Sequence, residues 1–333
     1  MKRTIFILLL FPLLFGLGRC KNDVNLLTDY KNYLVCYGLL DPNDTVHYIR
    51  LSKVFLGEGS AYDMASNPDT ANFRPGTADV FVERWLNGVM ITSWRLTPDT
   101  TIARDTGIFS NPYQVLYRGN FPVLKDGSIY KLYAKDVARG DIAQSETKIV
   151  QDPVITYPAG NFTPLNLYDT TTIRFGIKTG TNGVRYNLFV RFHYKEQFVF
   201  DTTEVSDKYI DWQIGTKDAS DDLGGEAIDF TIRRNNFLSA VAALIPVNPD
   251  VRRIAGTLDF YYTGASSDLK TYMDVGFANS NSTSPIATFT NITGGLGLFA
   301  SRTTSIFPNY SIDANTKSAL RNNTETVQLG FIR

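Results

Sequence analysis

Few side chains in this sequence could carry acid–base or nucleophilic chemistry. The 333 residues include only two histidines, His47 and His193, and two cysteines, Cys20 and Cys36. Both histidines lie in strand-like runs, and neither is spaced from a cysteine as a zinc ligand would be. The sequence also lacks a nucleophile elbow, a zinc-binding His-Glu-x-x-His helix, a phosphate-binding glycine loop and a dinucleotide fingerprint. We therefore predict no catalytic residue and no cofactor.

One acidic loop has the oxygen atoms that calcium requires. Asp218, Ser220, Asp222 and Asp229 fall at positions 1, 3, 5 and 12 of an EF-hand-like count. Position 6 should be glycine but is Leu223, and no helical pattern flanks the loop. A solvated acidic turn is the favoured interpretation, with a calcium site as the alternative. The carboxylate pair of a glycoside hydrolase cannot be identified from sequence, because such pairs usually come from distant strands.

Aromatic residues gather in a predicted hairpin around Asn87-Gly88, a dipeptide that readily forms a two-residue turn. With this turn, Trp85 lies opposite Met90 and Phe81 lies opposite Trp94. One face of the hairpin then carries Phe81, Trp85, Met90 and Trp94. The other face is also largely apolar, and only one can face a sandwich core. The aromatic face either packs on another part of the chain or binds a glycan or a protein partner.

Strand-like segments at regular spacing must position these residues. About seven short strands in roughly 120 residues predict an immunoglobulin-like β-sandwich over residues 30–151. A larger β-rich domain is predicted over residues 152–333, with short helices near 235–245 and 314–322. The whole chain is therefore expected to be all-β with short helices. The expected strands are 33–40, 46–51, 78–86, 89–96, 113–118, 129–135, 146–150, 171–179, 186–194, 209–214, 227–233, 253–262 and 269–277, with a strand-like close at 327–332.

The first twenty residues indicate export. Lys2 and Arg3 precede an apolar run that is too short to span a bilayer as a helix and that leads to Cys20. We predict a lipoprotein signal peptide over residues 1–19 and a tether over 20–29, with a lipid such as palmitate on Cys20. Arg19 occupies a position where a small residue is usual, so ordinary cleavage that leaves a secreted protein is the alternative. Without lipid, a disulfide between Cys20 and Cys36 becomes possible; with lipid, Cys36 is a buried inert thiol.

Composition narrows the possible partners. Lys and Arg together number 33, as do Asp and Glu, so the formal net charge is zero and no nucleic-acid partner is expected. The 18 tyrosines and 22 phenylalanines suit an all-β envelope protein.

Two stretches of the sequence resemble a known family. Residues 33–42 (YLVCYGLLDP) with 48–53 (YIRLSK) resemble its opening, and 258–260, 269–272 and 290–302 resemble its closing motif. The family comprises lipoproteins of Bacteroidota with a domain of unknown function. The resemblance implies an outer-membrane lipoprotein, often encoded near TonB-dependent receptors, and supplies no catalytic residues.

Together these features predict a lipid-anchored protein of the outer membrane that is not an enzyme. It would bind a ligand such as a glycan, or associate with a TonB-dependent receptor. An envelope hydrolase acting on glycans and a purely structural envelope component are the alternatives.

Overall fold

The computed structural model describes residues 33–54, 67–105, 112–121, 123–168, 172–280 and 288–332. Strands hold 51% of the residues and helices 14%, which confirms the predicted all-β class. The predicted signal peptide, the tether and Cys20 lie outside the described residues. Among the described residues, no helix has the length and apolar character needed to cross a membrane.

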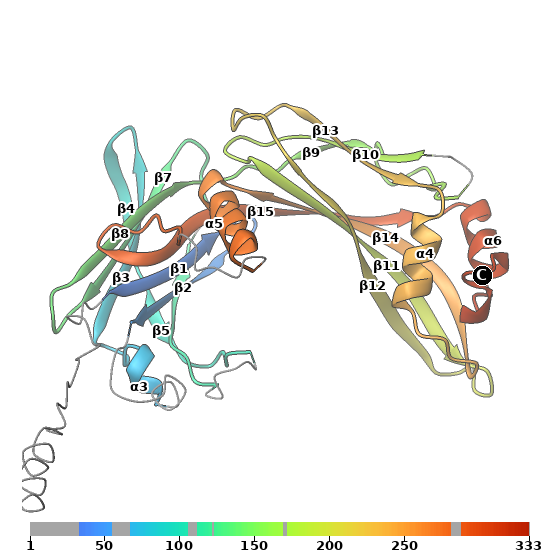
Figure 1. Cartoon of the computed structure of the whole chain (residues 1–333), viewed down its shortest axis with the longest axis horizontal. Helices are drawn as coiled ribbons and strands as arrows, with labels where there is room; N and C mark the ends of the chain where they lie inside the picture. Colours follow the sequence, from blue (N-terminus) through green and yellow to red (C-terminus); the bar gives the residue numbers. More distant parts are fainter. Residues whose placement is uncertain are drawn as a thin grey trace, which may run out of the picture. The chain divides into compact units, whose positions relative to one another are not determined.

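The first half of the chain forms an immunoglobulin-like sandwich (Figure 1). One layer has the order β1-β2-β6-β5, and the other has the order β4-β3-β7-β8. These orders correspond to the A-B-E-D and C′-C-F-G sheets of the immunoglobulin fold. The strands are β1 (Leu34–Leu40), β2 (Val46–Lys53), β3 (Ala78–Leu86), β4 (Val89–Arg95), β5 (Thr97–Asp99), β6 (Leu116–Asn120), β7 (Ile129–Asp136) and β8 (Ile142–Lys148), with the short helix α3 (Pro68–Ala71) between β2 and β3.

Apolar residues at alternate positions along these strands form the core of the first sandwich. Val80 and Val82 of β3 and Leu132 of β7 are buried, and each has outward-facing neighbours in the chain. Cys36 lies in the same core and is fully buried.

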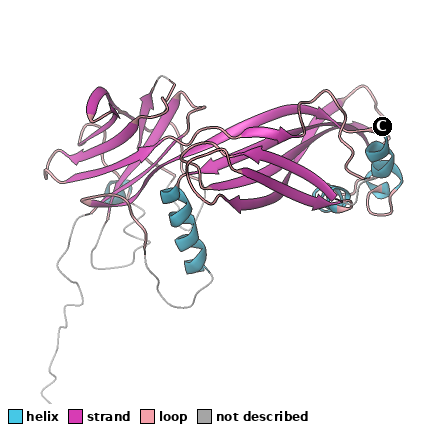
Figure 2. Cartoon of the chain, turned by 90° about the horizontal axis from the view of Figure 1, so that it is seen from above, coloured by secondary structure: helices cyan, strands magenta, loops and turns pink. Residues whose placement is uncertain are grey.

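The second half forms a larger sandwich, in which the order β12-β11-β14-β15 faces the order β13-β10-β9. The predicted boundary after residue 151 falls between β8 and the first of these strands. The helices lie at the margins of the sheets (Figure 2). The elements are β9 (Val154–Tyr157), β10 (Thr172–Lys178), β11 (Arg185–Phe198), β12 (Val205–Asp218), β13 (Ala227–Arg233), α4 (Asn236–Leu244), β14 (Val251–Ala265), α5 (Ser267–Ser280), β15 (Gly295–Ser311), α6 (Ala314–Asn322) and the 3-10 turn η1 (Val327–Leu329).

Strand β15 belongs to both sandwiches. It pairs antiparallel with β14 and parallel with β1, so one eight-stranded sheet runs through the two halves. Gly297 makes this possible: its φ is +111°, and a Cβ there would lie 2.0 Å from the carbonyl oxygen of Cys36. Asp152 adds a polar contact, because its carboxylate accepts hydrogen bonds from Asn43 Nδ2 and Ser305 Oγ, both at 2.8 Å. Residues 33–333 accordingly form one compact unit.

Two predicted strands are wrong. Residues 269–277 form most of helix α5, in which Leu269, Met273 and Phe277 recur at four-residue intervals and Lys270 pairs with Asp274 one turn on. Residues 327–329 form a 3-10 turn instead of a strand. The helices α4 and α6 occur where the two short helices were predicted.

A buried arginine closes the second sandwich. Arg253 of β14 is 1% exposed, and its Nη2 lies 2.8 Å from Glu196 Oε1. Its Nη1 donates to the carbonyl oxygen of Leu329 at 2.5 Å, and its Nη2 donates to that of Pro246 at 3.0 Å. One side chain therefore ties the C-terminal segment to the sheet.

Candidate ligand-binding face

The hairpin of β3 and β4 differs from its predicted register by one bulge. Trp85 lies opposite Met90 as predicted, but Ile91 is bulged out, so Val82 lies opposite Trp94 and Phe81 lies opposite Arg95. Trp94 therefore points to the core, where its ring lies 4.9 Å from that of Phe121. The predicted interaction face is corrected by this shift: it keeps Phe81, Trp85 and Met90 but loses Trp94.

Side chains on the outer face of the β4-β3-β7-β8 sheet form three in-register rows across the strands. We call this surface the outer face. Its rows follow from the strand pairing, because directly opposed residues share a face. The rows are Arg95–Phe81–Tyr133–Gln144, Ser93–Glu83–Lys131–Glu146 and Met90–Trp85–Ile129–Lys148.

Trp85 is held in place by its charged neighbours. Its indole Nε1 donates to Glu83 Oε2 at 2.8 Å, and Lys131 Nζ lies 4.6 Å from the centre of its ring. Lys131 Nζ also lies 3.4 Å from Glu146 Oε2. The middle row thus alternates acid, base and acid, and it fixes the orientation of the aromatic ring beside it.

A pocket of about 580 Å³ lies over the first two rows. Its wall beyond β8 consists of Asp268 at the start of α5 and of Asn291 and Thr293, which precede β15. Thr293 joins the edge of β8 through two backbone hydrogen bonds with Gln144, of 2.7 and 2.9 Å. Asn291 Nδ2 donates to Asp268 Oδ2 at 2.8 Å, so the wall is itself cross-linked.

Two further hollows continue the pocket along the sheet, with volumes of about 470 and 220 Å³. The first shares Trp85 and Lys131 with the main pocket, and the second shares Glu146 and Asp268. Asn182 lines both hollows. The three hollows form one groove, lined by carboxylates, amides, hydroxyls, two lysines and the ring of Trp85.

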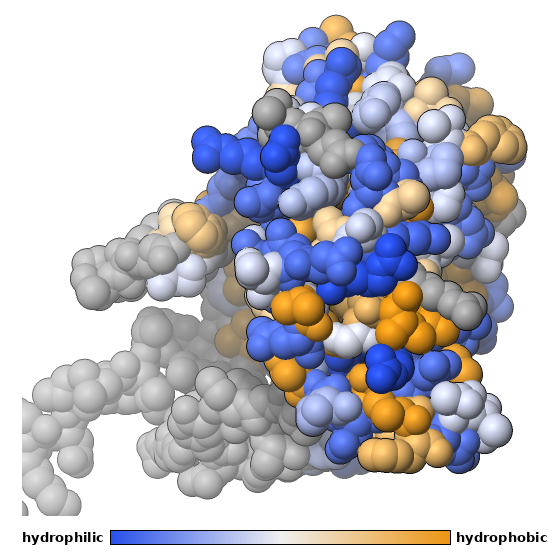
Figure 3. Space-filling model, turned by 90° about the vertical axis from the view of Figure 1, so that its right-hand side faces the viewer, coloured by the Kyte–Doolittle hydropathy of each residue, from blue (hydrophilic) through white to orange (hydrophobic). Residues whose placement is uncertain are grey.

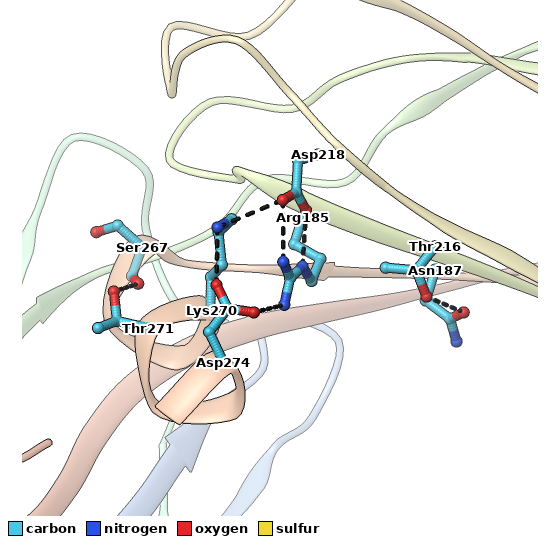
Figure 4. Close-up of polar contacts among 8 residues, drawn as sticks. All are labelled: Arg185, Asn187, Thr216, Asp218, Ser267, Lys270, Thr271 and Asp274. Carbon is cyan, nitrogen blue, oxygen red and sulfur yellow. Dashed lines mark hydrogen bonds and ion pairs between the residues drawn. The ribbon is translucent and has the colours of Figure 1, made fainter. Parts of the chain in front are cut away.

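Helix α5 supplies one wall of the groove although it has no buried residue. Ion pairs hold it against β11 and β12 (Figure 4). Arg185 donates to Asp218 with Nε and Nη2 at 2.6 and 2.9 Å, and its Nη1 reaches Asp274 of α5 at 2.5 Å. Lys270 lies 3.3 Å from Asp218 and 2.9 Å from Asp274. Hydrogen bonding from Arg185 holds the pKa of both carboxyls below the usual range.

The residues proposed for calcium do not come together. Asp218 is engaged by Arg185, and Asp229 by Arg174 at 2.6 Å. Ser220 donates through its backbone N and its hydroxyl to Glu226, both at 2.7 Å, and Asp222 lines the groove instead. In the part of the chain that the structure describes, no three His, Cys, Asp or Glu side chains are grouped to hold a metal.

The histidines and Cys36 have structural surroundings. His47 is 2% exposed and stacks on Phe121 with ring centres 5.0 Å apart, and burial lowers the pKa of its imidazole. His193 Nε2 lies 2.8 Å from Asp259 Oδ2, away from the groove residues. Burial raises the pKa of the Cys36 thiol to about 12, which makes this thiol inert.

Sequence reasoning found the β3 part of the groove but missed the rest. Lys131 and Glu146 become neighbours of Glu83 only through the pairing of β3, β7 and β8. Asp268 immediately precedes a segment expected to be a strand, and Asn291 lies three residues before a glycine-rich stretch. Alternation in residues 129–135 was the one signal that placed Lys131 on the outer face.

Apart from the groove, an apolar surface lies at the end of the second sandwich that carries α4 and α6. In Figure 3 apolar residues gather in patches there, with polar residues between them. The turn from β11 to β12 contributes exposed apolar side chains, among them Phe200 at 92% exposure. This surface lacks the convergent polar groups that the groove has.

Comparison with known proteins gives little guidance. No protein-family model matches the chain, and no curated protein matches it in sequence. Among solved structures, the chain is similar to the C-terminal globular domain of an oligosaccharyltransferase from Pyrococcus abyssi, with 10% identity and a TM-score of 0.22. The match covers 85% of this chain and 48% of the other, so it spans about half the length of that protein chain. A similarity at this level says nothing about function.

Proposed function

We propose that this protein is a lipid-anchored envelope protein that binds a saccharide in the groove on its outer face. The export-type N-terminus with Cys20 supports the location. The groove supports the ligand class, because it combines an aromatic ring with a row of carboxylates, amides and hydroxyls.

The placement of Trp85 beside the Glu83–Lys131–Glu146 row is the observation that carries the proposal. Sugar rings have apolar C–H faces that pack on an indole, and their hydroxyls need both donors and acceptors in a ring around that platform. Gln144, Ser145 and Asn291 extend the polar wall on one side. Because Glu83 and Lys131 hold the indole in place, little side-chain entropy is lost when a ring stacks on it.

Binding fits the groove better than hydrolysis does. Glu83 and Glu146 lie on strands separated by β7, which places their backbones roughly 10 Å apart. Lys131 stands between them, 3.4 Å from Glu146, where a glycosidase would need room for the scissile bond. A purely structural role would leave the groove unexplained.

The turn of the β3–β4 hairpin supports a second candidate function, association with an outer-membrane receptor. Val89, Met90 and Ile91 are 61%, 48% and 49% exposed and adjoin one another at the end of the sheet. Co-purification from gently solubilised membranes tests this function. Loss of a co-purifying receptor in Ile91→Asp, with an unchanged recovery in Val205→Asp, is the expected result; recovery of the wild-type protein alone contradicts it.

A glycan array screened with the full chain tests saccharide binding. We expect retention on a subset of acidic or amino sugars, and loss of that signal in Trp85→Ala. Phe162→Ala is the matched control, because Phe162 is an aromatic residue with 93% exposure that lines none of the three hollows. An array without binding, or equal signals from Trp85→Ala and the wild type, contradicts the proposal.

Metabolic labelling with a radioactive fatty acid tests the anchor. The intact protein should take up label and stay with the membrane fraction. Cys20→Ser should lose the label and become soluble. Equal labelling of both proteins contradicts lipidation at Cys20.

A further inference from the structure

On the side of the opposite sheet, the first sandwich carries two basic residues, Arg50 and Arg104, that have no acidic partner among the described residues. Arg50 lies on β2 between the buried residues Ile49 and Leu51, so it faces away from the core, where it is opposite Tyr37 of β1 and Leu116 of β6. Arg104 follows β5 in the chain. A hydrogen bond from its backbone N to the Pro112 carbonyl oxygen, at 2.8 Å, fixes its segment.

Each arginine has one unsatisfied nitrogen within the residues that the structure describes. The Nε atoms of Arg50 and Arg104 are buried and have no hydrogen-bond partner there. No ion pair with a described acid engages either guanidinium, whereas Arg95, Arg174, Arg185, Arg191 and Arg253 each have one. Burial and the charge of Arg104 both lower the pKa of Arg50, so the two cations are close enough to repel each other. Two partly buried cations without a counter-ion are unfavourable.

Two tyrosines border the same surface. The ring of Tyr37 lies 6.1 Å from that of Tyr272 of α5, in an edge-to-face arrangement. Burial, and then hydrogen bonding to Tyr272, raise the pKa of Tyr37 to about 12, so its hydroxyl keeps its proton and shares it with Tyr272. The surface therefore offers two guanidinium forks, both of them donors, beside a pair of tyrosines.

We propose that Arg50 and Arg104, beside Tyr37, form a binding site for a phosphate group. Guanidinium forks match the tetrahedral oxygens of phosphate through paired N–H donors, and a dianion balances two cations. The phosphate belongs to either a lipid headgroup or a soluble phosphorylated compound. The site is on the sheet opposite the saccharide groove, and it requires no saccharide.

Thermal unfolding of the full chain with Cys20→Ser tests the site. Phosphate should raise the Tm of the parent protein relative to chloride at equal ionic strength, because a ligand that binds only the folded state stabilises it. In Arg50→Gln and in Arg104→Gln the phosphate concentration needed for the same shift should rise at least tenfold. Arg174→Gln is the control, since Arg174 is a surface arginine paired with Asp229, and its response should equal that of the parent.

Thermal unfolding in chloride, without phosphate, shows whether a substitution itself impairs folding. Arg50→Gln should unfold at the same temperature as the parent or higher in chloride, because it relieves repulsion. No phosphate-specific shift in the parent, or an equal shift in Arg50→Gln, overturns the proposal.

Two further probes identify the source of the phosphate. Vesicles of phosphatidylglycerol should bind the parent and not Arg50→Gln if the ligand is a headgroup, and phosphatidylcholine vesicles should bind neither. Glycerol 1-phosphate should reproduce the shift of inorganic phosphate, with no vesicle binding, if the ligand is soluble. Each of these results supports the site, and equal vesicle binding by the parent and Arg50→Gln counts against it.

Discussion

The two sandwiches treat their buried basic side chains in opposite ways. In the second sandwich, Arg253 is almost fully buried, yet it has a carboxylate and two carbonyl oxygens as partners. In the first sandwich, His47 Nε2, Arg50 Nε and Arg104 Nε are buried without a hydrogen-bond partner in the described residues.

For basic side chains, this difference parallels the division between the scaffold and the proposed sites, while the Tyr262 hydroxyl shows that the second sandwich also buries a polar atom without a partner in the described residues. Buried polar groups are nearly always satisfied in stable folds, and the exceptions concentrate where a ligand completes the structure. The second sandwich, which carries the satisfied arginine and shares β15 with the first, supports the whole unit. The first sandwich carries both proposed sites, one on each outer surface.

Removing Arg253 should have the largest effect on stability. Arg253→Ala leaves Glu196 and two carbonyl oxygens unpaired, and we expect a loss of about 3–5 kcal/mol in the free energy of unfolding. Urea denaturation measures it. Arg252→Ala, at the exposed neighbouring position, should change stability by no more than about 0.5 kcal/mol. Equal losses of unfolding free energy in Arg253→Ala and Arg252→Ala would contradict a stabilising role for the buried arginine.

The joint between the sandwiches should be the next most sensitive point. Gly297→Ala places a Cβ against the carbonyl oxygen of Cys36 at a positive φ, and we expect a loss of about 1–3 kcal/mol. Gly215→Ala in β12 is the control, because a Cβ there has no neighbour within 4 Å. If both glycines tolerate alanine equally, β15 does not couple the two halves as described.

Helix α5, which has no buried residue, should depend on its charged contacts. Arg185→Gln removes the contact that joins Asp218 to Asp274, and we expect the local opening of α5 to become easier by about 1 kcal/mol. Hydrogen exchange of residues 267–280 measures this opening, and added salt should mimic the substitution. Arg191 lies on β11, as Arg185 does, and it forms a similar ion pair with Asp211. Arg191→Gln breaks this pair and should leave the opening of α5 unchanged. If neither Arg185→Gln nor added salt alters the hydrogen-exchange protection of α5, then packing holds the helix in place.

The smallest expected effect is the pH dependence from His47. Burial lowers its pKa in the fold below the ordinary 6.5, so the folded protein binds this proton less readily than the unfolded chain does. The contribution of His47 to the free energy of unfolding is fully present above about pH 7. It falls as the pH drops through 6.5 toward the pKa in the folded state. His47→Gln should flatten the unfolding free energy between about pH 7 and 5. An unchanged slope would mean that other groups titrate there.

Alternation of apolar residues predicted most of the strands but not β15. The inward positions of β15 include Ser301, Thr303 and Ser305, which are buried although polar. Asp152 accepts from Ser305 and Thr303, and Ser301 Oγ accepts from the backbone N of Val150. A strand whose buried face is built from hydroxyls shows no apolar period, so its partners have to be known first.

For a similar reason, the sequence predicted only part of the candidate site. The two-residue turn placed Trp85 correctly opposite Met90, but the bulge at Ile91 moved Trp94 to the core. Bulges depend on how a strand packs against its sheet, and local sequence does not specify them. Lys131 and Glu146 joined the site through long-range pairing, which one sequence does not reveal.

Calorimetric titration of the best array saccharide into the full chain measures directly whether Trp85 is the platform on which the saccharide binds. We expect Trp85→Ala to weaken the affinity at least tenfold, or about 1.4 kcal/mol, and Phe162→Ala to bind as the wild type does. An equal affinity of Trp85→Ala and the wild type would contradict this role of Trp85.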